Sequence, residues 1–196
     1  MELNLLKLLR QAEKLLSGKR SKRRKALRQI LVKHLLPLLK EKDLKKALEG
    51  KLNPIAGIRD NWVYPFWRNM DGAAQRIFRG IVRHNWDIIT ELLTNYDTIK
   101  EIFLEARPSL KKYVDHPNFK PLVEAVAAYT GAVLTVACWD CFCAICGRKV
   151  TPIDFIYFPN AHDPSGNPLP YAYRFTHHRC YADLIRRSGV LEKVRT

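Results

Sequence analysis

The sequence predicts a mainly α-helical protein that ends in a small α+β module. Apolar residues recur at helical spacing through most of the first 137 positions. Four of the five cysteines then fall within residues 138–146, and the pattern after them becomes strand-like. We therefore expect an N-terminal helix-turn-helix arm over residues 1–52, a helical bundle over 53–137 and the module over 138–196.

The arm is expected to contain two helices and a short third. Leucines at helical spacing predict a helix over residues 2–17. Ser21 suits the N-cap of a second helix, which Pro37 would bend or end. Residues 41–49 form the third helix, which would stop at Gly50. These helices carry more apolar surface than they can bury alone, so the arm must pack on something.

The bundle is expected to begin with a helix near residues 66–84, after a turn at Asn53-Pro54. Asp97 is the expected cap of a later helix. Residues 121–137 are apolar on nearly every side, which is typical of a central helix. The stretch is short for a membrane span and contains Glu124, and residues 1–10 lack the pattern of a secretory signal. We expect a soluble protein with no membrane span.

The C-terminal module has the composition of a strand pair followed by a helix. Residues 150–158 and 171–175 are strand-like, and residues 159–170 between them read as a loop. A helix is expected over residues 177–188.

Two cysteine and histidine pairs in this module predict a zinc site. Cys143 and Cys146 form a C-x2-C turn followed by glycine, and His177 and Cys180 lie one turn apart at the expected start of the last helix. Four nitrogen and sulfur ligands suit a closed, tetrahedral structural Zn²⁺ site. Clustered cysteines without an export signal favour a metal over disulfides.

Other residues could shift this ligand set. Cys138 and Cys141 form a rival C-x2-C pair, and His178 is a second histidine beside His177. The alternative without a metal is a group of small buried thiols with two incidental histidines.

The order of knuckle, hairpin and ligand-bearing helix over residues 141–190 resembles the treble-clef zinc finger. The resemblance implies a structural zinc, and it leaves function open because DNA binders, ribosomal proteins and nucleases share this fold. Nucleases of the HNH type place a catalytic histidine on the hairpin. The comparable residues are His162 and Asp163, whose order is reversed and which read equally well as a turn. We expect no enzyme activity.

Positive charge is concentrated at the N-terminus. The net charge is +15, and residues 1–51 contain 16 Lys or Arg against 5 Asp or Glu. The run KRSKRRK would start a helix, where the dipole disfavours cations but phosphate can accept both side chains and free N–H groups. A cationic segment on a nearly balanced body suggests a nucleic acid partner. The residues expected to contact phosphate here are Lys19, Arg20, Lys22, Arg23, Arg24, Lys25 and Arg28.

A second basic face is expected on the helix near residues 66–84. It contains arginines alone, and Gly72 and Gly80 share it and would permit close approach of a partner's backbone. The arginines are Arg68, Arg76, Arg79 and Arg83. The alternative is an ordinary solvated face, since surface arginine is common in heat-adapted proteins. Asn and Gln, the partners that read adenine, are missing from the cationic positions, so we expect sequence-independent binding.

This layout resembles the major capsid proteins of filamentous archaeal viruses with linear double-stranded DNA, particularly the tristromavirus type. The matching stretch is residues 2–49, with 19–28 against phosphate. The resemblance implies a coat subunit that is made in the host cytoplasm, holds A-form DNA in the virion and pairs with a related subunit. The alternative is a zinc-containing DNA-binding transcription or chromatin factor, and an HNH-type nuclease is a third possibility.

Overall fold

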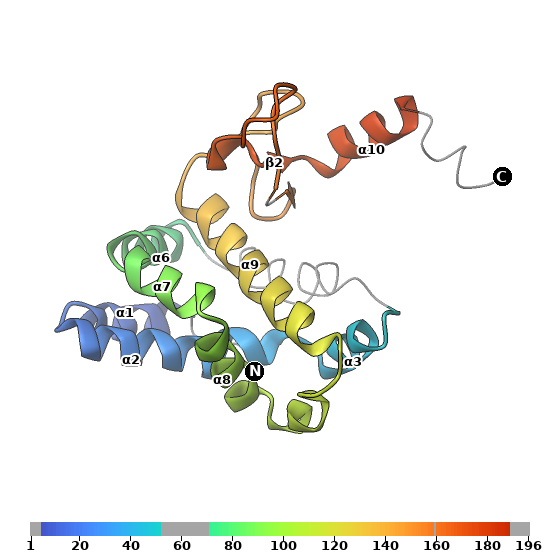
Figure 1. Ribbon diagram of the computed structural model, residues 1–196. Coiled ribbons are helices and arrows are strands. Elements are labelled where there is room, and N and C mark those ends of the chain that lie inside the picture. The colour runs from blue at the N-terminus through green and yellow to red at the C-terminus, as the bar shows by residue number, and fades with distance from the viewer. Residues whose placement is uncertain (1–4, 52–70, 159, 189–196) are drawn as a thin grey trace. The chain divides into compact units, whose positions relative to one another are not determined.

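The computed structural model describes residues 5–51, 71–158 and 160–188. Within these ranges the chain is mainly helical, with one pair of short strands near the C-terminus, so the predicted fold class is confirmed (Figure 1). The chain divides into two compact units, residues 1–134 and residues 135–196.

The first two helices are α1 (Leu5–Leu16) and α2 (Arg20–Ile30), which contact each other (Figure 1). The N-cap of α2 is Lys19, whose backbone oxygen already accepts from the Arg23 amide at 3.0 Å. The prediction that Ser21 caps this helix is therefore wrong. Helical hydrogen bonding begins two residues earlier without a side-chain cap, and Ser21 lies exposed in the first turn.

Regular α-helical geometry ends before Pro37, as predicted. Leu31–Leu35 form a π-helical turn (η1) and Leu36–Leu38 a 3-10 turn (η2). Proline has no N–H to donate and its ring crowds the carbonyl one turn back, so a continuous α-helix cannot form here. The short helix α3 (Glu41–Leu48) follows and stops at Gly50, whose φ of +70° is left-handed.

The first unit is also helical over residues 71–134, apart from short connections. Asp71 caps the first of these helices by accepting from the Ala74 amide at 2.7 Å. Asn95, and not the predicted Asp97, caps α8, because its side chain lies just before the helix and accepts from the Thr98 amide at 2.9 Å. The elements are α6 (Gly72–His84), α7 (Trp86–Thr94), α8 (Tyr96–Ala106), η4 (Pro108–Tyr113) and α9 (Phe119–Cys138).

The predicted central helix is confirmed as α9. Phe119 and Val123 are fully buried on it, and the Phe119 ring meets Phe103 edge to face with centroids 6.2 Å apart. Among the described helices, α9 alone is long and apolar enough to cross a membrane, and 72% of its most apolar stretch is buried inside the protein. That burial is what a core helix requires.

The N-terminal helices belong to the same unit as the bundle. In the described residues α1 contacts α6, α2 contacts α7, and both η1 and η2 contact α8. This packing buries Leu16, Leu27 and Leu31. The boundary expected at residue 52 therefore does not separate two compact units, because the apolar faces of the arm are covered by the helices that follow. The turn expected at Asn53-Pro54 lies outside the described residues.

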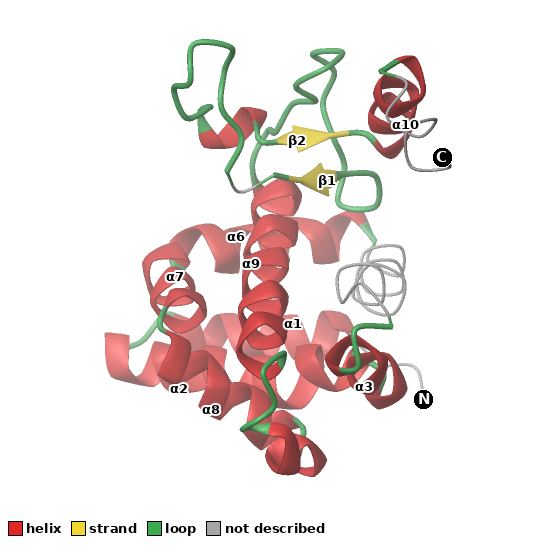
Figure 2. Cartoon of the chain, turned by 45° about the vertical axis from the view of Figure 1, so that its right-hand side comes forward, coloured by secondary structure: helices red, strands yellow, loops and turns green. Residues whose placement is uncertain are grey.

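The C-terminal unit has a two-stranded antiparallel sheet and a final helix (Figure 2). β1 (Ile156–Tyr157) pairs with β2 (Phe175–Thr176), and Tyr157 lies opposite Phe175. α10 (His178–Arg187) follows β2 and confirms the helix predicted there. Both strands are shorter than predicted.

Residues 171–175 form a strand only at their end. Tyr171–Tyr173 make a 3-10 turn (η5), in which the Tyr173 amide donates to the Pro170 carbonyl at 2.9 Å. The Tyr171 ring packs on Phe175 with centroids 5.7 Å apart. The alternating aromatic residues therefore form a turn that packs on Phe175, and not an extended strand.

Candidate metal centre and basic surfaces

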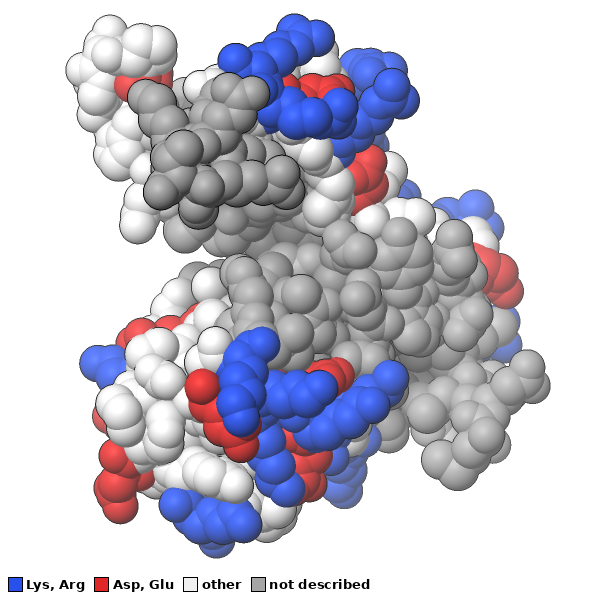
Figure 3. Space-filling view, turned by 90° about the vertical axis from the view of Figure 1, so that its right-hand side faces the viewer, with Lys and Arg blue, Asp and Glu red and all other residues white. Residues whose placement is uncertain are grey.

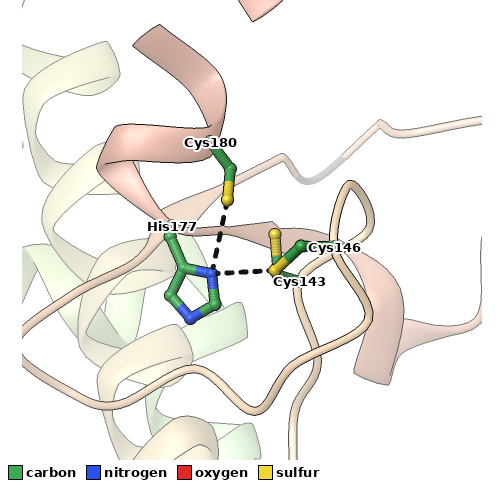
Figure 4. Close-up of side chains that lie close together, drawn as sticks. All are labelled: Cys143, Cys146, His177 and Cys180. Atoms are coloured by element: carbon green, nitrogen blue, oxygen red, sulfur yellow. Dashed lines mark hydrogen bonds between the residues drawn. The ribbon is translucent and has the colours of Figure 1, made fainter. Parts of the chain in front are cut away.

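The four predicted metal ligands come together in the C-terminal unit (Figure 4). Cys143 and Cys146 lie on the knuckle, and His177 and Cys180 lie at the start of α10. Each offers one ligand atom, and these atoms all lie within 4.8 Å of one another. The structure therefore has a Cys3His group that can hold a metal ion.

The spacing of the ligand atoms fits a tetrahedral ion. His177 Nδ1 lies 3.4 Å from Cys146 Sγ and 3.7 Å from Cys180 Sγ. Bond lengths of about 2.3 Å to sulfur and about 2.0 Å to nitrogen give a tetrahedral nitrogen–sulfur edge of about 3.5 Å. The observed distances lie on either side of that value.

The knuckle is a tight turn held by its own backbone. The Cys143 amide donates to the Arg148 carbonyl and the Gly147 amide donates to the Cys143 carbonyl, both at 2.8 Å. Gly147 has φ +70°, which a residue with a side chain adopts only with strain. A glycine at this position therefore lets the knuckle turn without backbone strain.

A backbone contact sets the orientation of the His177 ring. Its Nε2 lies 3.1 Å from the Lys149 carbonyl oxygen and donates to it, which leaves the lone pair on Nδ1. Nδ1 is the atom that faces the sulfurs of Cys146 and Cys180. Outer hydrogen bonds of this kind fix the tautomer of a metal-binding histidine.

The thiols differ in acidity because their surroundings differ. The backbone and then the side chain of Arg148 lower the pKa of Cys146 to about 6. Burial, followed by the neighbouring thiols of Cys146 and Cys143, raises the pKa of Cys180 to about 11. Adjacent thiolates repel one another, so a bound cation would offset this crowding and keep all three deprotonated.

The rival ligands lie elsewhere. Cys138 and Cys141 are buried outside the four-residue group, and burial raises the pKa of Cys141 to about 11. His178 Nδ1 lies 2.9 Å from Asp154 Oδ1 instead. Among the described residues, the ligand set is thus the one predicted first.

The loop that suggested a nuclease is a hydrogen-bonded turn. Asp163 Oδ1 accepts from the amides of Ser165 and Asn167, both at 2.9 Å. His162 Nδ1 contacts the Asn160 carbonyl oxygen at 2.7 Å. Neither His162 nor Asp163 belongs to the four-residue group, and the turn accounts for both.

Asp154 positions part of the metal centre, and no sequence pattern indicated this role. Its Oδ1 accepts from the His178 amide at 3.1 Å, at the start of α10. The N-cap residue His177 makes no side-chain capping bond, so Asp154 caps this helix from 24 positions away. It thereby positions the turn that carries His177 and Cys180.

Replacing Asp154 by alanine should weaken metal binding roughly fivefold, because it removes the cap of the turn that carries His177 and Cys180 and a helix cap contributes about 1 kcal/mol. Competition with a chromogenic chelator measures the affinity. Asp163→Ala is the matched control, since it removes a carboxylate from a turn outside the centre. Equal affinities for the two variants would show that Asp154 does not position the ligands.

Comparison of the chain with protein-family models, curated proteins and solved structures found no match. The function must therefore be inferred from the chain's own residues.

The arginines of α2 are paired within the first unit. Arg20 pairs with Asp87 and Glu91, and Arg24 Nε pairs with Glu91 at 2.9 Å. These contacts hold the two arginines beside α7, although their side chains remain partly exposed.

The other two arginines of α2 are engaged in the same way. Arg28 pairs with Glu105 on α8, and its Nη2 lies 4.0 Å from Oε2 of Glu101 on the same helix. Arg23 Nη1 donates to Asn85 Oδ1 at 2.9 Å, and Asn85 is fully buried. All four arginines predicted to face phosphate on this helix thus contact groups of α7, α8 or the turn before α7.

The lysines of the run lie on the other side of α2. Lys19, Lys22 and Lys25 recur every three residues and are exposed. No ion pair is found for them within the described part of the chain. We call these three residues the lysine face.

The second predicted basic face lies on α6. Arg76 and Arg83 are exposed there and Arg79 is partly buried, whereas Arg68 lies outside the described residues. Gly72 and Gly80 have no atom within 4 Å of an added Cβ, so packing among the described residues does not demand a glycine at either position. Both glycines lie on α6 together with these arginines.

The surface around α3 carries mixed charge. Figure 3 shows Lys and Arg side chains lying among Asp and Glu on this side of the molecule. Glu41 pairs with Lys45 at 2.6 Å and Glu49 with Lys51 at 2.9 Å. The lysines of α3 are therefore weaker candidates for binding a polyanion than the lysine face.

Proposed function

We propose that the protein binds double-stranded DNA without sequence specificity and coats it as a structural subunit, and that Zn²⁺ holds its C-terminal unit together. The observation that carries the DNA-binding part is the lysine face: Lys19, Lys22 and Lys25 are exposed at the positive end of α2 without acidic partners among the described residues. Phosphate accepts such side chains and the free amides of a helix start together.

The arginines of α6 extend the candidate phosphate contacts. Arg76, Arg79 and Arg83 together with the lysine face give about six phosphate contacts, for which log Kd should change with log salt with a slope of about 5 in magnitude. Lysine offers charge without a base-reading geometry, which supports sequence-independent binding.

Zinc is the metal that the donor set favours. Three thiolates and one imidazole with near-tetrahedral spacing suit Zn²⁺, and four protein ligands leave no position for a substrate. The site is therefore structural. The C-terminal unit has a two-residue strand pair and a small core around Phe155 and Phe175, so a metal cross-link would add to its stability.

The coat role rests on the resemblance of residues 2–49 to filamentous archaeal virus capsid proteins. It implies a virion location, A-form DNA and a related partner subunit.

The alternative, a zinc-containing regulator, is favoured by one observation. α1 and α2 pack against α6 and α7, as in a self-contained DNA-binding domain, and do not form an extended arm.

The deciding experiment mixes the purified chain with random-sequence duplex DNA and images the product. We expect filaments whose length follows the DNA, with a salt slope of about 5. Discrete particles that form on one preferred sequence would support the regulator. An absence of binding at 50 mM salt would exclude both functions.

A further inference from the structure

Four carboxylates form a row against α2. Asp87 and Glu91 lie one turn apart on α7, and Glu101 and Glu105 lie one turn apart on α8. Opposite them on α2, Arg20, Arg24 and Arg28 recur every four residues and so share one stripe of the helix. We call the four carboxylates the acidic row.

The acidic row and the arginines are matched in spacing, with four carboxylates against three arginines. Both sets step by four residues, which is about 6 Å along a helix. Glu91 contacts two arginines at once, since its Oε1 lies 2.9 Å from Arg24 Nε and its Oε2 lies 2.9 Å from Arg20 Nη2. The contacts with Arg24 and then Arg20 hold the pKa of Glu91 below its usual range.

These pairs are open to solvent. The side chains of Arg20 and Arg24 are 52% and 40% exposed, and that of Glu91 is 44% exposed. Exposed ion pairs add little to stability and weaken in salt, so they can exchange partners. A guanidinium group binds phosphate with the same fork that binds carboxylate.

We infer that the acidic row competes with nucleic acid for Arg20, Arg24 and Arg28, which line the side of α2 opposite the lysine face. This inference rests on the proposed DNA binding and adds its regulation. In the free chain only the lysine face on this helix is offered to a polyanion, and the arginines engage when a phosphate backbone displaces the carboxylates. The row thereby lowers the affinity of the chain for DNA, because phosphates must displace the carboxylates before they reach the arginines.

The test neutralises the row in the full chain with the changes Asp87→Asn, Glu91→Gln, Glu101→Gln and Glu105→Gln. Fluorescence anisotropy with a random-sequence 30-bp duplex then gives Kd from 50 to 300 mM salt. Three released guanidinium groups should steepen the salt slope by about 2 to 3 and tighten binding at 100 mM salt on the order of 100-fold.

The matched control removes the same charge from four exposed acids of the same unit that lie outside the row. It tightens binding through the general field but should leave the slope unchanged, because no new phosphate contact forms. The control changes are Glu13→Gln, Asp97→Asn, Asp115→Asn and Glu124→Gln.

A second comparison ties the effect to the arginines. Adding Arg20→Gln, Arg24→Gln and Arg28→Gln to the row-neutralised chain should return the slope to that of the natural sequence. Glu91→Gln alone should give an intermediate salt slope. This single variant tests the inference if the fourfold variant loses its helical circular dichroism and is therefore unfolded.

The possible results separate the two ideas. Equal slopes for the row variants and the control, with binding intact, overturn the inference and leave the proposed function standing. A steeper slope and tighter binding for the row variant than for the control support the inference. No binding by any variant removes both.

Discussion

Removing the metal ion will unfold the C-terminal unit and leave the N-terminal unit folded. The C-terminal unit has a two-residue strand pair, a small core around Phe155 and Phe175, and a helix, α10, with no buried residue, so its own packing is limited. A structural zinc site supplies on the order of 10 kcal/mol of apparent binding free energy. The first unit has its own core around Phe103 and Phe119 and does not contain the ligands.

Hydrogen exchange read by mass spectrometry, before and after chelation, measures this effect for each unit. Protection should vanish across residues 141–187 and persist in α7 and α8. Cys143→Ser should reproduce the loss, whereas Cys141→Ala, which changes a buried thiol outside the centre, should bind metal normally. Metal analysis should find one zinc per chain, and less than about half an equivalent would contradict the site.

Replacing Lys19, Lys22 and Lys25 together by glutamine should weaken duplex DNA binding by about two to three orders of magnitude at 0.1 M salt. Three lost phosphate contacts lower the salt slope by about 2.7, which corresponds to about 500-fold between 1 M and 0.1 M salt. The lysines are exposed and unpaired among the described residues, so the change should leave the thermal stability within about 0.5 kcal/mol.

The matched control replaces Lys42, Lys46 and Lys111, which are exposed elsewhere in the same unit, and so removes the same net charge. It should weaken binding only modestly, through the overall field. Should both triple variants lose affinity equally, with equal salt slopes, the lysine face would not be the contact surface.

Features set by near neighbours in the chain were predictable. The pairs Cys143–Cys146 and His177–Cys180 each lie three residues apart, so a turn and a helix start present them together whatever the rest of the chain does. The apolar periodicity of α9 likewise predicts burial on all sides. The placement of Gly147 follows from the same local geometry.

Partners far apart in the chain were not predictable. The seven residues KRSKRRK contain lysines and arginines that look equivalent in sequence, but α2 turns Arg20 and Arg24 onto carboxylates about 70 positions away and turns Lys22 and Lys25 to solvent. The capping of α10 by Asp154 depends on the same kind of distant contact.

The physical reason is that helical periodicity and turn geometry are properties of a few adjacent residues, whereas the partner of a charged side chain is chosen by how helices pack. The chain alone thus specified its helices, the break at Pro37 and the Cys3His ligand set. Tertiary packing alone decided that the N-terminal helices join the bundle. It also decided that the arginines of α2, and not its lysines, meet carboxylates among the described residues.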